Sequence, residues 1–320
     1  MPVDTIWVVV EPAGGAAATN GLELLRGARE LASSVVAVTF GDANAAAASL
    51  GDHGAGTVLT VDTGNAMAGV PVAAALVAAV EARGAPAAIL LPQTYEGRDI
   101  AGRLSVALDA PVLANVVGLA EAGGRLVAEH AVFGGSTIVK AAFTTDKVQL
   151  FVVRPKSFVA EGGVGAAAAV EALTVPDTGR PGATTVLARH AEERQGPALD
   201  EAAVVVSGGR GLGEKERFAW IEELARLLKG APGASRAIVD AGWVPYSYQV
   251  GQTGKTVKPN VYLAIGISGA TQHMVGMKGA KKIIAVNKDR EAPIFGIADL
   301  GVVGDVTKVV PKLIEALKAR

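Results

Sequence analysis

The residues best suited to chemistry lie in short polar loops of the last third of the chain. The first of these loops is SGGRGLG at residues 207–213. Glycines there allow a tight turn and let backbone N–H groups approach a phosphate at a helix N-terminus. The loop departs from G-x-G-x-x-G because residue 214 is Glu, and it lacks the Gly-Lys-Ser/Thr ending of a P-loop. This loop is either a phosphate-binding loop or a plain strand–helix turn. Arg210 within it either faces a ligand or is solvated.

Two further loops offer hydrogen-bonding groups rather than acids and bases. In GASR at residues 233–236, a Ser hydroxyl suits a phosphate and an Arg guanidinium suits an anion or an electron-rich ring. A turn serine and a surface arginine are the simpler alternative. QVGQTGKT at residues 249–256 resembles a P-loop only superficially, because that motif requires Gly at 249, which is Gln. Its Gln and Thr side chains suit the edge of a heterocycle.

The segment GISGATQH at residues 266–273 contains His273, one of four histidines in the chain. Ser268 suits either a helix cap or a phosphate at the helix N-terminus. An isolated helical histidine is more often structural than catalytic, and no cysteine, metal-ligand set or nucleophile elbow accompanies this one. We therefore interpret His273 as a polarising or positioning group instead of a general base.

Asn287 and Asp305 follow apolar runs close to the C-terminus. An amide or a carboxylate at the end of a strand can hold a ribose or the edge of adenine. An Asx turn or a helix cap explains each residue equally well, since Asp305 directly precedes a predicted helix.

These loops follow the strands of a predicted α/β pattern in the C-terminal part of the chain. The expected strands are residues 203–206, 236–240, 261–265, 282–286 and 294–297, and the expected helices are residues 215–229, 272–277 and 308–319. The pattern is typical of a small doubly wound domain, whose ligands bind beyond the carboxyl ends of the strands. The polar loops occupy those ends, so we expect them to converge on one site.

The N-terminal half alternates β-branched runs with Ala-rich helical windows. The expected strands are residues 5–10, 35–39, 57–60, 87–91, 137–142 and 149–153, and the expected helices are residues 22–32, 66–83 and 99–108. Nearly all-apolar strands that alternate with helices indicate a parallel sheet covered on both faces. No helix separates residues 137–142 from residues 149–153, so we expect part of this sheet to be antiparallel.

Residues 176–197 mix turn residues with charges and predict a linker between two domains, residues 1–195 and 196–320. The charge divides in a similar way. Residues 1–200 carry 13 basic and 20 acidic side chains (net −7), and residues 201–320 carry 17 and 11 (net +6), which sum to the formal −1. A basic domain favours an anionic cofactor or a nucleic acid.

The composition excludes several classes of protein. The chain has no cysteine, which excludes disulfide scaffolds, thiolate metal sites and cysteine nucleophiles. It is 50% hydrophobic and 19% charged, which excludes wholesale disorder. The longest apolar stretch, residues 66–80, is shorter than the ~18–20 residues of a membrane span, and the first residues lack signal-peptide features. We expect a soluble, cytoplasmic protein that is not membrane-embedded.

Taken together, the loops resemble the alpha subunit of electron-transfer flavoprotein, the FixB family. The resemblance is carried by VVVSGGRGLG (204–213), GASRAIVDAGWVP (233–245), QVGQTGKTVKPNVYLAIGISGATQHMVGM (249–277), AVNKDREAPIF (285–295), IADLGVVGD (297–305) and VVPKLIEAL (309–317). Similarity is looser in the N-terminal half, around residues 97–111. The resemblance implies two doubly wound, mainly parallel-sheet domains, the C-terminal one a Rossmann-like FAD-binding domain, in a heterodimer with a beta subunit that holds AMP or a second FAD.

The resemblance also implies a set of FAD contacts, with no protein group as catalyst and no metal. The implied contacts are Arg210, Ser235, Arg236, Val250, Gly251, Gln252, Thr253, Ser268, Gly269, Ala270, Thr271, Gln272, His273, Asn287, Asp305 and Val306. By the same resemblance, Arg236 lies against the isoalloxazine ring, Thr253 near its N5 and His273 near its C2 carbonyl. Ser268 contacts the diphosphate, and Asn287 and Asp305 contact the adenosine.

The implied function is that of an electron carrier. It accepts electrons from flavoprotein dehydrogenases, such as the acyl-CoA dehydrogenases of fatty acid β-oxidation, and passes them to a membrane quinone oxidoreductase. The alternatives are a bifurcating or NADH-oxidising relative, and a nucleotide-binding regulatory protein without redox chemistry. A nucleic-acid binder is least favoured, because the basic residues are not interleaved with aromatic ones.

Overall fold

A computed structural model describes residues 2–41, 49–163, 167–179, 184–188 and 196–319. The chain folds as two compact units, residues 1–190 and 191–320. The predicted domain boundary at residues 195/196 falls at the edge of residues 189–195, which lie outside the described part of the chain, so that exact boundary stays a prediction.

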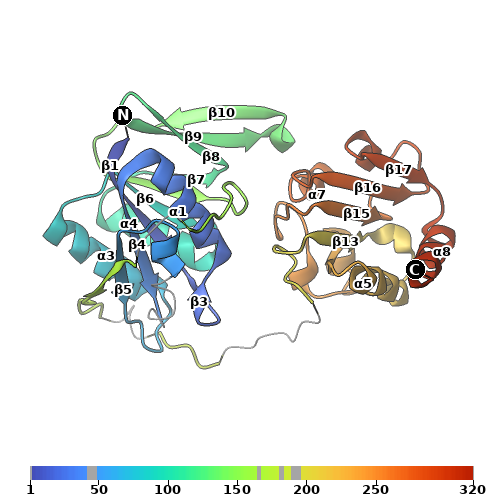
Figure 1. The fold of residues 1–320 in the computed structure, drawn as a ribbon, viewed down its shortest axis with the longest axis horizontal. Coiled ribbons are helices and arrows are strands. Elements are labelled where there is room, and N and C mark those ends of the chain that lie inside the picture. Colours follow the sequence, from blue (N-terminus) through green and yellow to red (C-terminus); the bar gives the residue numbers. More distant parts are fainter. Residues whose placement is uncertain (1, 42–48, 164–166, 180–183, 189–195, 320) are drawn as a thin grey trace. The chain divides into compact units, whose positions relative to one another are not determined.

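The N-terminal unit is built on a seven-stranded sheet in the order β12-β5-β4-β1-β6-β11-β7 (Figure 1), and every neighbouring pair is parallel. Its strands are β1 (Val3–Val10), β4 (Ala32–Phe40), β5 (Thr57–Val61), β6 (Ala88–Pro92), β7 (Val112–Val116), β11 (Gln149–Val153) and β12 (Ala169–Leu173). Five of these strands were expected from their apolar runs. β7 and β12 lie at the two edges of the sheet, and their more exposed sequences carry a weaker signal.

Helices cover both faces of this sheet, as the apolar strands predicted. Helix α1 (Thr19–Leu31) packs Leu24 and Leu25 into the same buried cluster as Val8 of β1. Helices α3 (Gly69–Arg83) and α4 (Tyr95–Ala107) contribute to a second cluster that contains the neighbouring Val9. Because successive side chains of a strand point to opposite faces, a strand covered on both faces must be apolar at every position.

The expectation of an antiparallel strand in this sheet is wrong. Residues 137–142 form β10, which pairs in a separate antiparallel sheet in the order β10-β9-β8, with β8 (Gly118–Ala122) and β9 (Arg125–Val132). β11 instead enters the main sheet parallel to β6 and β7. The small sheet takes the place of a crossover helix, and exposure of nearly every residue of β10 explains why that strand does not belong in a central sheet.

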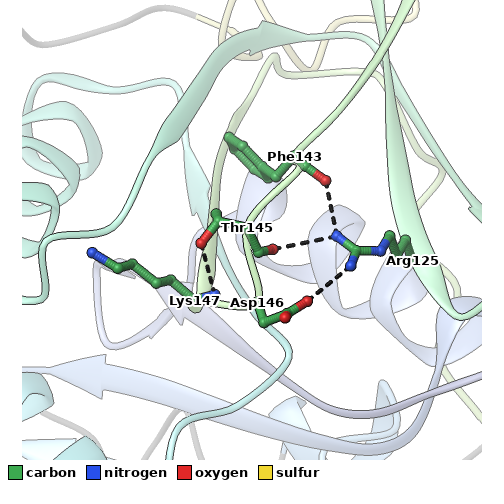
Figure 2. A network of polar contacts seen from close by, with 5 residues as sticks. All are labelled: Arg125, Phe143, Thr145, Asp146 and Lys147. Atoms are coloured by element: carbon green, nitrogen blue, oxygen red, sulfur yellow. Dashed lines mark hydrogen bonds and ion pairs between the residues drawn. The ribbon is translucent and has the colours of Figure 1, made fainter.

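Arg125 ties the turn between β10 and β11 to β9 (Figure 2). One guanidinium nitrogen of Arg125 donates to the carbonyl oxygens of Phe143 (3.1 Å) and Thr145 (3.4 Å), and another donates to Asp146 Oδ1 (2.8 Å). The backbone N–H of Lys147 donates to Thr145 Oγ1 at 3.2 Å. These bonds fix the point at which the chain leaves the antiparallel sheet and returns to the core. The remaining short elements of this unit are the β2–β3 hairpin (Pro12–Ala13 and Ala16–Ala17) and the 3₁₀ helix η1 (Phe133–Gly135).

The C-terminal unit is a five-stranded parallel sheet in the order β14-β13-β15-β16-β17. Its strands are β13 (Val204–Gly208), β14 (Ala231–Ala234), β15 (Val261–Ile265), β16 (Lys282–Asn287) and β17 (Leu300–Val303). Its helices are α5 (Phe218–Leu227), α6 (Arg236–Val239), α7 (Thr271–Met274) and α8 (Val306–Lys318), with 3₁₀ turns η3 (Arg210–Leu212), η4 (Lys215–Arg217), η5 (Tyr246–Tyr248) and η6 (Pro293–Gly296).

Two strands expected in this unit are wrong. Residues 236–239 form helix α6, and residues 293–296 form the turn η6, whereas the actual strands β14 and β17 lie just before and just after them. Both actual strands are at the edges of the sheet. β14 reads APGA, and an edge strand tolerates the Pro and Gly that argue against a central one. The apolar residues of 236–239 instead supply Ile238 to a helix-covered core.

The two faces of this sheet are covered differently. Helices α5 and α8 bury Ile221 and Ile314 in one cluster with Val206 of β13. The opposite cluster contains Val205 and is closed by loop residues, including Val250 and Met277. The polar loops singled out in the sequence therefore complete the hydrophobic core on one face while their tips reach the carboxyl edge. Within the described residues, no helix combines the length and the apolar character needed to cross a bilayer.

Candidate nucleotide site at the carboxyl edge of the C-terminal sheet

The strand order of the C-terminal unit reverses beside its first strand, β13. β13 lies between β14, the next strand in sequence, and β15, the one after that, so the connections leave β13 in opposite directions. In open α/β sheets, ligands bind at such a switch point, outside the carboxyl ends of the strands. All strands are parallel, so the loops after β13, β14, β15, β16 and β17 lie along one edge. These loops contain Arg210, Ser235, Ser268, Asn287 and Asp305.

Glycines let the two loops at the switch point touch through their backbones. The Gly211 N–H donates to the Gly266 carbonyl at 2.9 Å. A Cβ atom at Gly211 would lie 2.7 Å from Gly266 Cα, and one at Gly209 would lie 2.4 Å from the Gly266 oxygen. Gly266 itself has φ +66°. The glycines of SGGRGLG are thus required by close approach of two loops, whatever ligand they face.

The loop at residues 249–256 joins the site from a different part of the chain. The Val250 N–H donates to the Ala234 carbonyl at 2.9 Å, and the Gln252 N–H donates to the Gln272 carbonyl at 2.7 Å. Gly251 has φ +143°, and a Cβ there would lie 2.8 Å from the Gln272 oxygen. The loop is therefore fixed between the end of β14 and helix α7. The exposed side chains of Gln252, Thr253, Thr271 and Gln272 lie on these two segments.

Inside this loop, the side chains of Gln249 and Thr253 are hydrogen-bonded to each other. Gln249, which is 2% exposed, donates from Nε2 to Thr253 Oγ1 at 3.0 Å. Tyr246 Oη also donates to the Thr253 carbonyl. The backbone and side chain of Thr253 are consequently oriented by their neighbours while the residue itself is exposed.

His273 lies on helix α7 and is 6% exposed. Its Nε2 is 2.9 Å from Tyr262 Oη, and within the described residues its Nδ1 has no hydrogen bond of good geometry. Burial lowers the pKa of His273 to about 4, and the Val250 backbone partly opposes that shift. Burial also raises the pKa of Tyr262, which the Ser207 hydroxyl opposes. Both rings are therefore neutral at pH 7.

This buried histidine makes the stability of the chain depend on pH. Below pH 6.5 the unfolded chain protonates His273 while the folded chain does not until about pH 4, so stability falls as pH drops through this window. The expected contribution is a loss of about 2 kcal/mol between pH 7.5 and pH 5. Urea unfolding of the wild-type chain and of His273→Gln at both pH values isolates this contribution. Equal pH dependence of the two proteins would show that His273 is not buried as a neutral ring.

Two arginines stand at the carboxyl edge with exposed side chains. Arg236 begins helix α6, directly after β14, and its Nε lies 3.0 Å from Asp240 Oδ2. Arg210 begins the turn η3 after β13, and no described residue forms an ion pair or hydrogen bond with its guanidinium. Ser235 is half-buried between these segments, and its N–H donates to the Gly208 carbonyl at 2.9 Å. The edge therefore carries two positive charges suited to an anion.

Asn287 and Asp305 already have structural roles in this structure. Asn287 Nδ2 donates to the Ile267 carbonyl at 2.9 Å, and its Oδ1 accepts from the Asp289 N–H at 2.9 Å. Asp305 Oδ1 caps helix α8 by accepting from the Thr307 N–H at 2.9 Å, and this bond lowers the pKa of Asp305. Asp305 is therefore the helix cap that was considered as an alternative to ligand binding. Because Asp305 is also exposed, the cap does not exclude a ligand contact.

The other predicted site residues fall into an exposed and a buried group. Ser268 and Ala270 are exposed at the loop before α7, and Gly269 between them is buried with φ +87°. Val250 and Val306 are 1% and 4% exposed, with side chains in the two hydrophobic clusters. Only the backbone of these two valines can face a ligand.

Sequence reasoning missed the buried polar residues beneath the loops, which are Ser207, Gln249 and Tyr262. All three are 2% exposed or less. The signal was a polar residue inside an apolar strand, VVVSG for Ser207 and VYLAI for Tyr262. Gln249 bonds Thr253 and Tyr262 bonds His273, both at the site, whereas the Ser207 hydroxyl has no partner within the described residues.

Comparisons with known proteins agree on one family for both units. Residues 6–178 match the electron transfer flavoprotein domain, and residues 198–278 match the electron transfer flavoprotein FAD-binding domain. The chain is 43% identical over 318 residues to the electron transfer flavoprotein subunit alpha of Mycobacterium leprae, with 98% of each chain covered. It is 46% identical over 225 residues to the subunit of the same name from Paracoccus denitrificans, covering 70% of this chain and 71% of that one.

A third relative, protein FixB of Clostridium saccharobutylicum, is 36% identical over 320 residues, covering 98% of this chain and 96% of that one. The similarity thus extends over both units and includes the loops of the carboxyl edge. The chain belongs to the electron transfer flavoprotein alpha-subunit family.

Proposed function

We propose that this chain binds FAD at the carboxyl edge of its C-terminal unit and works in the cytoplasm as an electron carrier. The observation that supports this most is that polar loops from five parallel strands lie along one edge, where the loops after β13 and β15 touch at the switch point and residues 249–256 join them. The match of residues 198–278 to an FAD-binding domain family supports the same ligand. The strand order is the flavodoxin-like variant of the doubly wound fold, and in that sense we propose a Rossmann-like cofactor domain.

The donor set at this edge fits an anionic dinucleotide. Ser268 and the backbone around Gly269 suit the diphosphate, because hydroxyls and N–H groups donate to phosphate oxygens. Asn287 and Asp305 suit the adenosine, and Thr253 suits the edge of the flavin ring. Arg236 supplies positive charge that favours the reduced, more negative flavin, and Arg210 adds a second positive charge at the same edge of the sheet. The remaining contacts we propose are those of Ser235, Val250, Gly251, Gln252, Ala270, Thr271, Gln272, His273 and Val306.

When bound, FAD supplies one- and two-electron transfer, and the protein binds and tunes it. Neither an acid–base pair nor a nucleophile is required from the chain for that chemistry. His273 is neutral at pH 7, so it acts here by hydrogen bonding, and the positive charge comes from the arginines.

We propose that the chain works in a heterodimer with a beta subunit, which carries AMP or a second FAD and contacts the N-terminal unit. Its electron donors are flavoprotein dehydrogenases, such as acyl-CoA dehydrogenases, and its acceptor is a membrane quinone oxidoreductase. Family membership supports the pairing with a beta subunit, and the donor and acceptor are inferred from the resemblance alone.

Anaerobic stopped-flow absorbance of the heterodimer tests this role. We expect the flavin to be reduced rapidly by a substrate-reduced acyl-CoA dehydrogenase and to be unaffected by NADH on the same timescale. Rapid reduction by NADH would instead favour the bifurcating or NADH-oxidising alternative. A flavin that no reduced dehydrogenase can reduce would contradict the carrier role.

A further inference from the structure

Tyr262 lies under the candidate site, in the middle strand of the C-terminal sheet. It is fully buried in β15, and its hydroxyl lies 2.9 Å from His273 Nε2. The two rings meet edge to face, with centroids 6.1 Å apart and an interplanar angle of 61°. A buried tyrosine hydroxyl needs a hydrogen-bond partner, and this one finds it in a residue of the helix that borders the site.

Ser207 lies on the same face of the adjacent strand. Val205 pairs with Tyr262 and Ser207 with Ala264, so Ser207 is two residues closer to the carboxyl edge than the tyrosine's own register partner. Ser207 is fully buried, and within the described residues its hydroxyl has no hydrogen-bond partner. A Cβ at Gly233 would lie 2.3 Å from Ser207 Oγ. Because Gly233, the first residue of GASR, has no side chain, the Ser207 hydroxyl has room at this position.

These contacts give the hydrogen bonds a direction. A neutral imidazole has one donor and one acceptor nitrogen. Among the described residues, the acceptor that the buried Tyr262 hydroxyl meets is His273 Nε2, so the Tyr262 O–H donates to that nitrogen. The proton of the neutral ring then belongs on Nδ1, and Nε2 is the acceptor.

The imidazole consequently links two elements beneath the site. His273 belongs to α7 and Tyr262 to β15. The loop of residues 249–256 is bound to α7 by the Gln252 N–H, which donates to the Gln272 carbonyl at 2.7 Å. We propose that Tyr262 is a positioning residue of the FAD site, which fixes the tautomer and the orientation of His273 and thereby holds α7 against that loop. This inference rests on the proposed function.

The tautomer is measured first, by long-range proton–nitrogen NMR of histidine-labelled chain in its complex with the beta subunit. His273→Gln identifies the His273 signals, and variants of His53, His130 and His190 identify them by elimination if that one fails to fold. We expect the wild-type proton on Nδ1, and an approximately five-fold shift toward the Nε2-protonated form in Tyr262→Phe, as for loss of one hydrogen bond. A wild-type proton on Nε2 would overturn the inference.

FAD affinity is measured next, by flavin fluorescence on the same heterodimers. We expect Tyr262→Phe to weaken FAD binding by about five-fold. Tyr248→Phe is the matched control, because Tyr248 packs against Phe218 on the other face of the sheet. Wild-type affinity in Tyr262→Phe would overturn the positioning role. A wild-type heterodimer that binds no FAD would contradict the proposed function instead, and the tautomer result would still stand by itself.

Discussion

Gly211→Ala weakens FAD binding at least about five-fold in the expected result, although the residue carries no side chain to lose. An added Cβ would lie 2.7 Å from Gly266 Cα and 2.8 Å from the Gly266 oxygen, and backbone atoms cannot rotate away as a side chain can. The loops after β13 and β15 must then separate, and the Gly211 N–H bond to the Gly266 carbonyl lengthens from 2.9 Å. A shift of this kind costs about 1–3 kcal/mol.

The matched control is Gly296→Ala in the same unit. Gly296 has no atom within 4 Å of an added Cβ and has no positive φ, so that substitution leaves the fold and the FAD affinity unchanged. Flavin titration of both heterodimers, together with their thermal unfolding, separates loss of binding from loss of folding. Normal FAD affinity in folded Gly211→Ala would place the cofactor away from the β13/β15 switch point.

Arg236→Ala lowers the reduction potential of the bound flavin. The guanidinium is exposed at the carboxyl edge and favours the flavin state that carries more negative charge. Removing a full charge beside the ring changes the balance between the oxidised and reduced forms by about 1–3 kcal/mol. Asp240 shares this charge through its 3.0 Å contact, so Asp240→Asn is expected to shift the potential in the opposite direction.

Arg226→Ala is the control for the loss of one positive charge from the unit. Arg226 is in the last turn of α5, which returns from the carboxyl edge toward the amino edge of the sheet, and its side chain is 68% exposed. Spectroelectrochemical titration of the three variants measures the potentials. The same potential in Arg236→Ala as in wild type would remove Arg236 from the flavin environment, and an equal shift in Arg226→Ala would reduce the effect to overall charge.

The sequence predicted the central strands of both sheets and missed the edge ones. A central strand such as β1 is apolar at every position from Ile6 to Val10 because both of its faces are covered there. An edge strand such as β14 does not need a continuous apolar sequence. Its sequence, APGA, therefore resembles a turn. Strands β8 and β9 were missed, and β10 was expected as a strand but assigned to the main sheet. Only tertiary pairing distinguishes an exposed antiparallel strand from a strand of the main sheet.

The sequence predicted which loops form the candidate site, but the contacts between those loops could not be predicted. Strand ends mark the loops, but the proximity of Gly211 to Gly266 and of residue 252 to residue 272 depends on strand order, which no local pattern encodes. The burial of His273 against Tyr262 was invisible for the same reason. That burial changes the electrostatic account, because a neutral histidine leaves the arginines as the source of positive charge.

The cofactor content of the purified heterodimer tests the central claim most directly. The chain is co-expressed with its beta subunit, the complex is denatured, and the released flavin is quantified and separated from AMP by chromatography. We predict a yellow complex with FAD bound to wild type and a lower FAD content in Gly211→Ala. A colourless wild-type complex that cannot be reconstituted with FAD would contradict the account.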